Sequence, residues 1–157
     1  MAAAESAHKR ICDAVAAAIV ALGLTDYPNA HVIDDEHVLV RWGIETEPKG
    51  FPCVFVSPVG TVSVTGGTNE RDDWSRPVTI YIADRISLAQ HGAMDAVLLW
   101  PERISKRFIQ QRLAVEGLTH CWGQFNPSPV LDTAIVQAFS LLVEPIFFNF
   151  ISREARG

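Results

Sequence analysis

The sequence lacks the glycine-rich loops that hold nucleotide phosphates. Neither GxGxxG nor GxxxxGK[ST] occurs, although the backbone of a phosphate-binding loop needs glycines at those spacings. The nearest fragment, Gly66-Gly67-Thr68, lies between two predicted strands, where a hairpin tip explains the glycines better than an anion site. A GxSxG nucleophile elbow is also missing. The sequence therefore supports neither nucleotide binding nor a serine hydrolase of this kind.

Cysteine is scarce, and basic residues are outnumbered. Cys12, Cys53 and Cys121 form no CxxC pair, which argues against a disulfide framework or a zinc site and favours reduced core residues of a cytosolic protein. The chain carries 13 Lys and Arg against 18 Asp and Glu, a net charge of −5. Phosphate binding needs clustered basic residues, so this balance argues against a protein that wraps DNA and is compatible with DNA that slides past without binding.

Long apolar runs are absent as well. No run approaches the roughly 20 residues that cross a bilayer. Residues 11–24 follow Lys9 and Arg10 as a signal peptide would, but Asp13 interrupts them. We therefore expect a soluble protein that is not exported. With 157 residues, of which 48% are hydrophobic, the chain is one domain in size and large enough to fold without disulfide bonds or a structural metal.

Two segments show helical spacing. The first has an apolar stripe that starts at Ile11, with Lys9, Arg10 and Asp13 largely off it, and is predicted to end near Gly23. The second covers residues 92–115 and is stopped by Gly117. In the second, Pro101 either kinks one helix or begins another. The apolar stripes consist of Ile11, Val15, Ala18, Ile19 and Leu22 in the first, and of Val97, Ile104 and Phe108 in the second.

Extended segments fill the middle of the chain. We predict strands at residues 37–42, 53–57, 61–65 and 78–83, each rich in β-branched or aromatic residues. The last two can pair as a long hairpin whose tip is the polar loop of residues 66–76. In the last strand one face carries Val78, Ile80 and Ile82, and the other carries Thr79, Tyr81 and Ala83.

The final third holds residues 118–125, a turn at residues 126–129, and an apolar stretch over residues 135–151 that Glu144 and Pro145 interrupt. Pro145 marks an edge, a bulge or a strand boundary, because proline cannot donate to a ladder. In the strand after it, Ile146, Phe148 and Phe150 alternate with Phe147, Asn149 and Ile151. Such a strand lies either centrally between layers or against another subunit.

These elements predict a single α+β domain over residues 1–157. We expect a mixed or antiparallel sheet of about four to five strands, flanked by two or three helices, with a protruding β-hairpin loop.

Few residues suggest chemistry. Asp72 and Asp73 are adjacent, so in a strand they point to opposite faces, and a solvated charged loop is favoured over a metal site. His120 next to Cys121 is the nearest approach to a catalytic pair, but sequence neighbours rarely meet in a catalytic geometry, and a packed pair on a strand is favoured. We therefore expect no catalytic residues, no metal and no cofactor.

Other side chains favour contacts with a partner. Arg103, Lys106, Arg107 and Arg112 are placed on the second helix, where a solvated face or a patch that meets an acidic neighbour is favoured over phosphate binding. Trp74 and Trp122 lie among polar or turn residues. Tryptophan is enriched at interface anchors, so for each of them partner contact and packing against the core remain open.

The order of elements resembles one known family. It consists of a helix, strands that include Phe51-Pro52-Cys53-Val54-Phe55-Val56-Ser57-Pro58, the charged loop Gly67-Thr68-Asn69-Glu70-Arg71-Asp72-Asp73, a strand over residues 78–85, a helix, and a late strand ending in Arg153-Glu154-Ala155-Arg156-Gly157. This order is similar to that of the tail terminator proteins of long-tailed bacteriophages, the group of the lambda tail terminator. The similarity covers most of the chain.

The resemblance implies a structural virion protein without an active site, assembled in the host cytoplasm. Its subunits would form a hexameric ring that caps the tail tube and docks to the head connector or stopper, while DNA passes through the channel without specific binding. The expected subunit or tail-tube contacts are Thr68, Asn69, Glu70, Arg71, Asp72, Asp73 and Trp74. Alternatives are another neck or tail completion protein, a metal-assisted cytosolic enzyme built from Asp72, Asp73 and histidines, and a monomeric binding module or assembly chaperone.

Overall fold

The computed structural model describes residues 6–25, 34–44, 52–84, 94–131 and 141–155. These residues form two helices and six strands, which confirms the predicted α+β class. In chain order the elements are α1 (Ala7–Ala21), β1 (Val38–Val40), β2 (Cys53–Ser57), β3 (Ser63–Gly67), β4 (Arg71–Asp84), α2 (Met94–Phe108), β5 (His120–Asn126) and β6 (Leu142–Ala155).

The strands form one mixed sheet in the order β1-β2-β4-β6-β5, and β3 pairs with β4 outside this path. Only the β1–β2 pair is parallel among the described strands; the other pairs are antiparallel. The sheet has six strands, slightly more than the four to five expected. The predicted β2 matches the observed Cys53–Ser57, whereas β1 is shorter than predicted.

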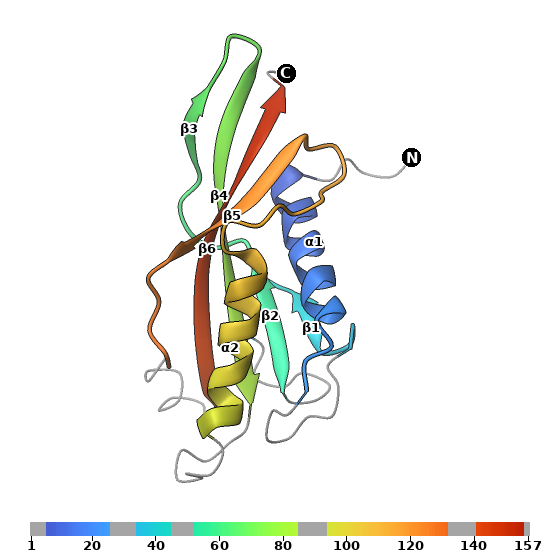
Figure 1. Ribbon diagram of the computed structural model, residues 1–157, viewed down its shortest axis with the longest axis vertical. Coiled ribbons are helices and arrows are strands. Elements are labelled where there is room, and N and C mark those ends of the chain that lie inside the picture. Colours follow the sequence, from blue (N-terminus) through green and yellow to red (C-terminus); the bar gives the residue numbers. More distant parts are fainter. Residues whose placement is uncertain (1–5, 26–33, 45–51, 85–93, 132–140, 156–157) are drawn as a thin grey trace.

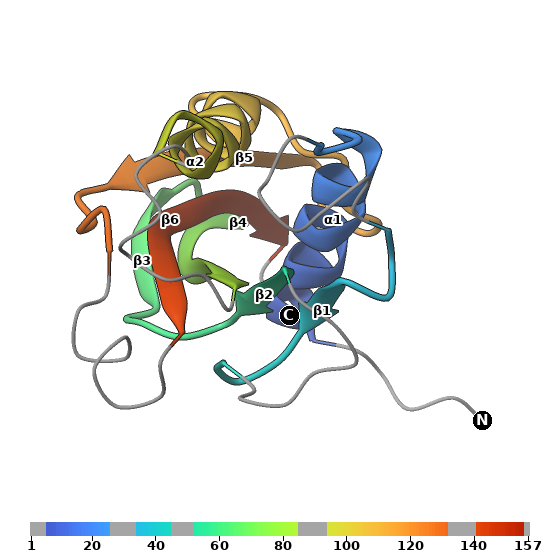
Figure 2. The ribbon, with the colours of Figure 1, turned by 90° about the horizontal axis from the view of Figure 1, so that it is seen from below.

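Both helices pack on one face of the sheet and enclose the main core (Figure 2). Val78, Ile80 and Ile82 of β4 point into this core, as their alternation predicts, and all three are fully buried. Phe108 at the end of α2 packs edge-on against Phe148 and Phe150 of β6, with ring centroids 5.9 and 5.8 Å apart. A smaller apolar cluster lies on the other face of the sheet and contains Cys53, Phe55, Ala83, Leu141 and Val143, with Tyr81 at its margin.

α1 begins at Ala7 and includes Lys9 and Arg10, which precede the apolar stripe. The hydroxyl of Ser6 accepts a hydrogen bond from the Lys9 amide and so caps the first turn. Ile11, Val15 and Ile19 are buried, which confirms the predicted stripe. The helix ends just before Gly23, whose positive φ of 59° provides the left-handed backbone common after a helix.

α2 is one helix with Pro101 inside it, which resolves the alternative left open by the sequence. It ends at Phe108, earlier than predicted. The residues that follow bond to β5 instead: the amide of Gln110 donates to the Gly123 carbonyl at 3.0 Å, and the amide of Leu113 donates to the Cys121 carbonyl at 2.8 Å. Arg112 therefore lies beside β5 and not on the helix with the other three basic residues.

β4 and β6 each contain a proline, Pro77 and Pro145, at a position that has a described strand neighbour on one side only. On one edge of β4, β3 pairs with residues 72–75 and β2 pairs with residues 79–83, so Pro77 lies between them. The missing N–H of Pro77 is harmless there. Its carbonyl is used, because Nε2 of His8 lies 2.6 Å away and must donate to it. The sheet edge at this gap is thus tied to α1.

β6 begins at Leu142 and continues through Glu144 and Pro145, so neither residue ends the strand. It lies between β4 and β5 in the sheet. Ile146, Phe148 and Phe150 are buried on one face, whereas Phe147, Asn149 and Ile151 on the other are half-buried, so β6 is not covered by layers on both faces. β5 pairs with β6 only from Phe147 onward, so among the described residues Pro145 has a strand neighbour only in β4. The part of the predicted apolar stretch before Leu141 lies outside the described residues.

The β4–β6 ladder gives the molecule an elongated shape. Each of these strands has 14 residues, and they pair over their full length. One end of the ladder is covered by the helices, and the other end rises past them with β3 at its side (Figure 1). We call residues 63–76, which comprise β3, the following turn and the first part of β4, the arm.

The predicted hairpin is therefore present, but the loop predicted over residues 66–76 is longer than the observed one. Only residues 68–70 lie outside strands, and residues 71–76 belong to β4. The polar sequence Arg71-Asp72-Asp73 has little intrinsic strand propensity. It is extended because β6 reaches Ala155 and pairs with it residue by residue.

Candidate functional site

The seven expected contact residues occupy the end of the arm. Thr68, Asn69 and Glu70 form the turn and are exposed, as is Arg71 at the start of β4. Asp72, Asp73 and Trp74 follow in β4 and are half-buried. The structure thus brings all seven together at one end of the molecule, and four of them are exposed.

The turn at the tip is closed by Thr68. Its amide donates to the Arg71 carbonyl at 2.7 Å, and its hydroxyl accepts from the amides of Glu70 and Arg71 at 3.4 and 3.3 Å. Gly67 precedes it with a φ of 154°, and a Cβ atom there would lie 2.5 Å from the Arg71 carbonyl oxygen. The glycine is therefore needed for the close approach of the two strands, and no anion site is required to explain it.

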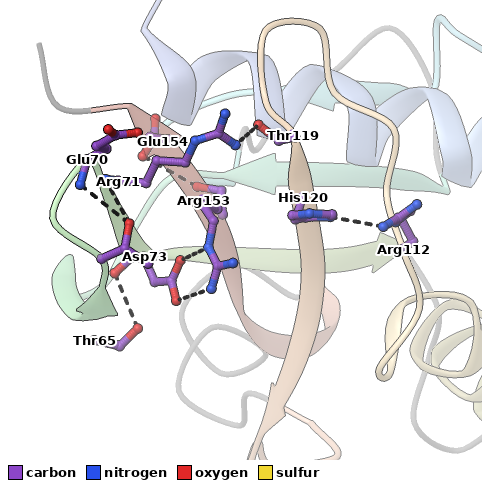
Figure 3. Close-up of polar contacts among 11 residues, drawn as sticks. Thr65, Glu70, Arg71, Asp73, Arg112, Thr119, His120, Arg153 and Glu154 are labelled. Carbon is purple, nitrogen blue, oxygen red and sulfur yellow. Dashed lines mark hydrogen bonds and ion pairs between the residues drawn. The ribbon is translucent and has the colours of Figure 1, made fainter.

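Asp73 is held by an ion pair with the neighbouring strand. The guanidinium of Arg153 donates from Nε and Nη2 to the two carboxylate oxygens, at 2.8 and 3.1 Å (Figure 3). This hydrogen bonding is the main cause that holds the pKa of Asp73 below its ordinary value of 3.8, and the charges of Arg153 and His120 act in the same direction against an opposing effect of burial. The pair joins β4 to β6 directly.

The opposite face of the same strands carries a second polar group. Arg76 donates to the Glu154 carboxylate and to the Ser152 hydroxyl, in the latter case at 3.2 Å. Its guanidinium carbon also lies 4.9 Å from the ring centroid of Trp74. Trp74 is therefore half-buried beneath a cation on its own strand, which is a favourable arrangement for both side chains.

One further contact connects the arm to Thr119, just before β5, and another connects β5 to the segment after α2. Nη1 of Arg71 donates to the Thr119 hydroxyl at 3.3 Å, and Nη2 of Arg112 donates to Nδ1 of His120 at 2.9 Å (Figure 3). The arm is thus braced against β6 and Thr119 by side chains as well as by the backbone ladder. A braced hairpin presents its tip in a fixed orientation, which lowers the entropy cost of binding.

The residues considered for chemistry are not arranged for it. Asp72 and Asp73 lie on opposite faces of β4, as predicted, and Asp73 is paired with Arg153. His120 and Cys121 are strand neighbours in β5, and burial is the main cause that raises the pKa of Cys121 to about 12. Such a thiol is inert at neutral pH. Within the described ranges, no three His, Cys, Asp or Glu side chains are grouped closely enough to hold a metal ion.

The basic residues of α2 make local contacts. Arg103 donates to the Leu22 carbonyl at 3.0 Å, Lys106 pairs with Glu102 one turn away, and the Arg107 guanidinium lies 5.4 Å from the Phe108 ring centroid. Each of them thus contacts a different neighbouring group. All three cysteines are buried and unbridged, as expected. No helix among the described residues is long and apolar enough to cross a membrane.

The most exposed tryptophan was not singled out from the sequence. Trp42 was expected to end a strand, but it follows β1 and is 82% exposed. Trp122, by contrast, lies half-buried in β5 opposite Ile151 of β6. The signal available in the sequence was the position of Trp42 directly before Gly43, where a strand that stops early leaves a large aromatic side chain outside the sheet.

Comparison with protein-family models finds no match for this chain, and comparison with curated proteins finds no significant match either. The function is therefore argued from the fold and from the arm.

Proposed function

We propose that this chain is a structural subunit of a ring at the head–tail junction of a long-tailed bacteriophage, where it acts as a tail terminator. The observation that carries this proposal is the arm, a braced hairpin that projects past the helix-covered core and ends in exposed polar residues (Figure 1). A ring subunit needs two different surfaces that meet in successive copies. A projecting arm supplies one of them.

The composition of the arm suits contact with other proteins. Its tip is Thr68, Asn69, Glu70 and Arg71, whose side chains offer hydrogen-bond donors, acceptors and both signs of charge. The ion pairs of Asp73 with Arg153 and of Arg76 with Glu154 lie below the tip and hold the strands that carry it. These features support a contact role, and the paired state of Asp73 makes the metal-assisted enzyme the weaker candidate.

Electron microscopy of the purified protein tests the proposal. The protein is imaged alone and after mixing with tail tubes of a long-tailed phage. The expected result is rings of about the tube diameter, free or seated at tube ends. A variant with Asn69→Ala and Glu70→Ala should lose tube-end binding, whereas Val130→Ala, which changes an exposed residue outside the arm, should retain it.

Other outcomes separate the alternatives. Protein that stays monomeric and leaves tube ends bare under all conditions contradicts the proposal. Rings that bind isolated head connectors but never tail tubes point to another neck protein. A monomer that changes its assembly state only with one partner points to a binding module or chaperone.

A further inference from the structure

A second surface lies beside the base of the arm, where its wall residue His8 contacts the Pro77 carbonyl. A cavity of about 380 Å³ opens between the start of α1 and the ends of β1 and β2. We call it the α1–β1 pocket. Figures 1 and 2 share their horizontal axis, and in both β1 and β3 lie toward opposite sides of the molecule. The wall residues used below are Lys9, Val40, Arg41, Trp42 and Pro58.

Trp42 forms one wall of this pocket and leaves 82% of its surface in water. Its neighbours Val40 and Pro58 give the pocket further apolar walls. A large aromatic beside a partly formed apolar pocket is the arrangement of an interface anchor, since tryptophan dominates such contacts when a partner removes it from water.

The arm offers a matching apolar strip. Val62, directly before β3, and Val64, within it, are 44% and 53% exposed, and every residue from 61 to 70 is exposed. Among the described strands, β3 pairs only with β4. Its outer edge therefore presents backbone donors and acceptors beside two β-branched side chains, which favours pairing with another chain.

The charges of the two surfaces are also complementary. The pocket rim carries the cationic side chain of Arg41, and that of Lys9, which already pairs with Asp13 at 2.8 Å. The arm carries Glu70 and Asp72 close to β3, while Asp73 is already neutralised by Arg153. Opposite charges at two different surfaces of one subunit favour head-to-tail contact between identical copies over contact of either surface with itself.

We infer that β3 of one subunit docks against the α1–β1 pocket of the next, with Trp42 covered by Val62 and Val64. The occupant of the pocket is a second copy of this chain. This inference rests on the proposed ring and names the two surfaces that close it. Each subunit then uses both surfaces once, which is the requirement for a closed ring.

Cross-linking between two variants, each with one added cysteine, tests the contact. Gly43→Cys adds a side chain with nothing within 4 Å of its Cβ, next to Trp42. Ser63→Cys changes an exposed residue at the start of β3. The native thiols are buried. A short bismaleimide should join a Gly43→Cys chain to a Ser63→Cys chain in the mixture and should join neither variant to itself.

A second variant tests the anchor. Trp42→Ala should raise the protein concentration needed for half-maximal ring formation roughly tenfold or more, because interface tryptophans carry a large share of binding energy. The melting temperature should be nearly unchanged, because the side chain is exposed. Val130→Ala, at a residue that is 65% exposed, is the matched control and should assemble as the parent does.

The two readouts separate this inference from the proposed function. Rings without a cross-link between positions 43 and 63 overturn the inference and leave the ring proposal standing. The cross-link without rings supports the contact between copies and contradicts the terminator function. Absence of both overturns both.

Discussion

Gly60 occupies a position that no other residue fits. Its φ is 140°, and a Cβ atom would lie 2.5 Å from Cβ of Pro77, at the gap between β2 and β3. Gly43 is the natural control, since a Cβ there meets nothing within 4 Å and its φ is ordinary. The base of the arm therefore depends on the absence of a side chain at one residue.

We predict that Gly60→Ala lowers the free energy of unfolding by about 1–3 kcal/mol through backbone strain and overpacking. Gly43→Ala should leave it unchanged or raise it by about 0.4–1 kcal/mol, because it restricts only the unfolded chain. Urea unfolding of both variants measures the difference. Equal stabilities would contradict the close contact with Pro77.

Asp73 makes the arm sensitive to acid. Its folded-state pKa is lowered from 3.8, so the ion pair with Arg153 stabilises the fold above the pKa of the unfolded carboxyl and loses that effect as the pH falls through the lower folded value. We predict that Asp73→Asn lowers the melting temperature at pH 7 and that the gap to the parent closes toward pH values below 3.8. Glu102→Gln, in an exposed pair, should show a smaller gap. A gap independent of pH would contradict the role of the pair.

The burial of individual side chains was predicted best where apolar residues alternate along a strand. The alternation of Val78, Ile80 and Ile82 correctly predicted which face of β4 is buried in the main core. Successive side chains of a strand point to opposite faces, so apolar residues at every second position identify the face that packs on the core. The exposure of Trp42 was missed because it depends on where β1 ends. β1 ends at Val40, two residues before its predicted end, and leaves Trp42 outside the strand.

At the scale of elements, the last turn of α2 packs closely against the sheet. Phe108 is 1% exposed, and its ring meets both Phe148 and Phe150. Gly123 of β5 passes so close to this turn that a Cβ atom would lie 2.5 Å from the Phe108 carbonyl oxygen. The end of the helix therefore fixes its distance from both β5 and β6.

We predict that Phe108→Ala lowers the free energy of unfolding by about 3–5 kcal/mol, the usual cost of removing a buried aromatic side chain. Ile109→Ala, at the next residue, which is 38% exposed, should cost roughly 1 kcal/mol or less. Chemical denaturation followed by circular dichroism measures both. A loss for Phe108→Ala as small as that for Ile109→Ala would contradict this attachment.

The elements themselves were predicted unevenly. Residues 53–57 matched β2 because their β-branched and aromatic run is bounded by Pro52 and Pro58. The polar first half of β4 and the continuation of β6 through Pro145 were not predictable, since both depend on pairing with a strand about 70 residues away. The seven residues proposed as contacts lie together at the end of the arm, but their form as a braced strand end could not be predicted without the pairing with β6.

At the scale of the whole molecule, the negative net charge argues against DNA binding. The net charge is −5, and the basic residues of α2 make local contacts. We predict that the protein does not retard duplex DNA in a native gel at physiological salt, because phosphate binding requires a basic patch. Retardation that weakens steeply with added salt would contradict the expected passive channel.

The continuous ladder of β4 and β6 also has a mechanical consequence. A load applied to the arm along the strands pulls on many transverse hydrogen bonds at once, so the tip and the helix-covered body behave as one stiff lever. A load that peels β3 sideways from β4 meets those bonds one at a time. A ring built on this arm would therefore resist tension along the molecule's long axis and would come apart first by unzipping at β3.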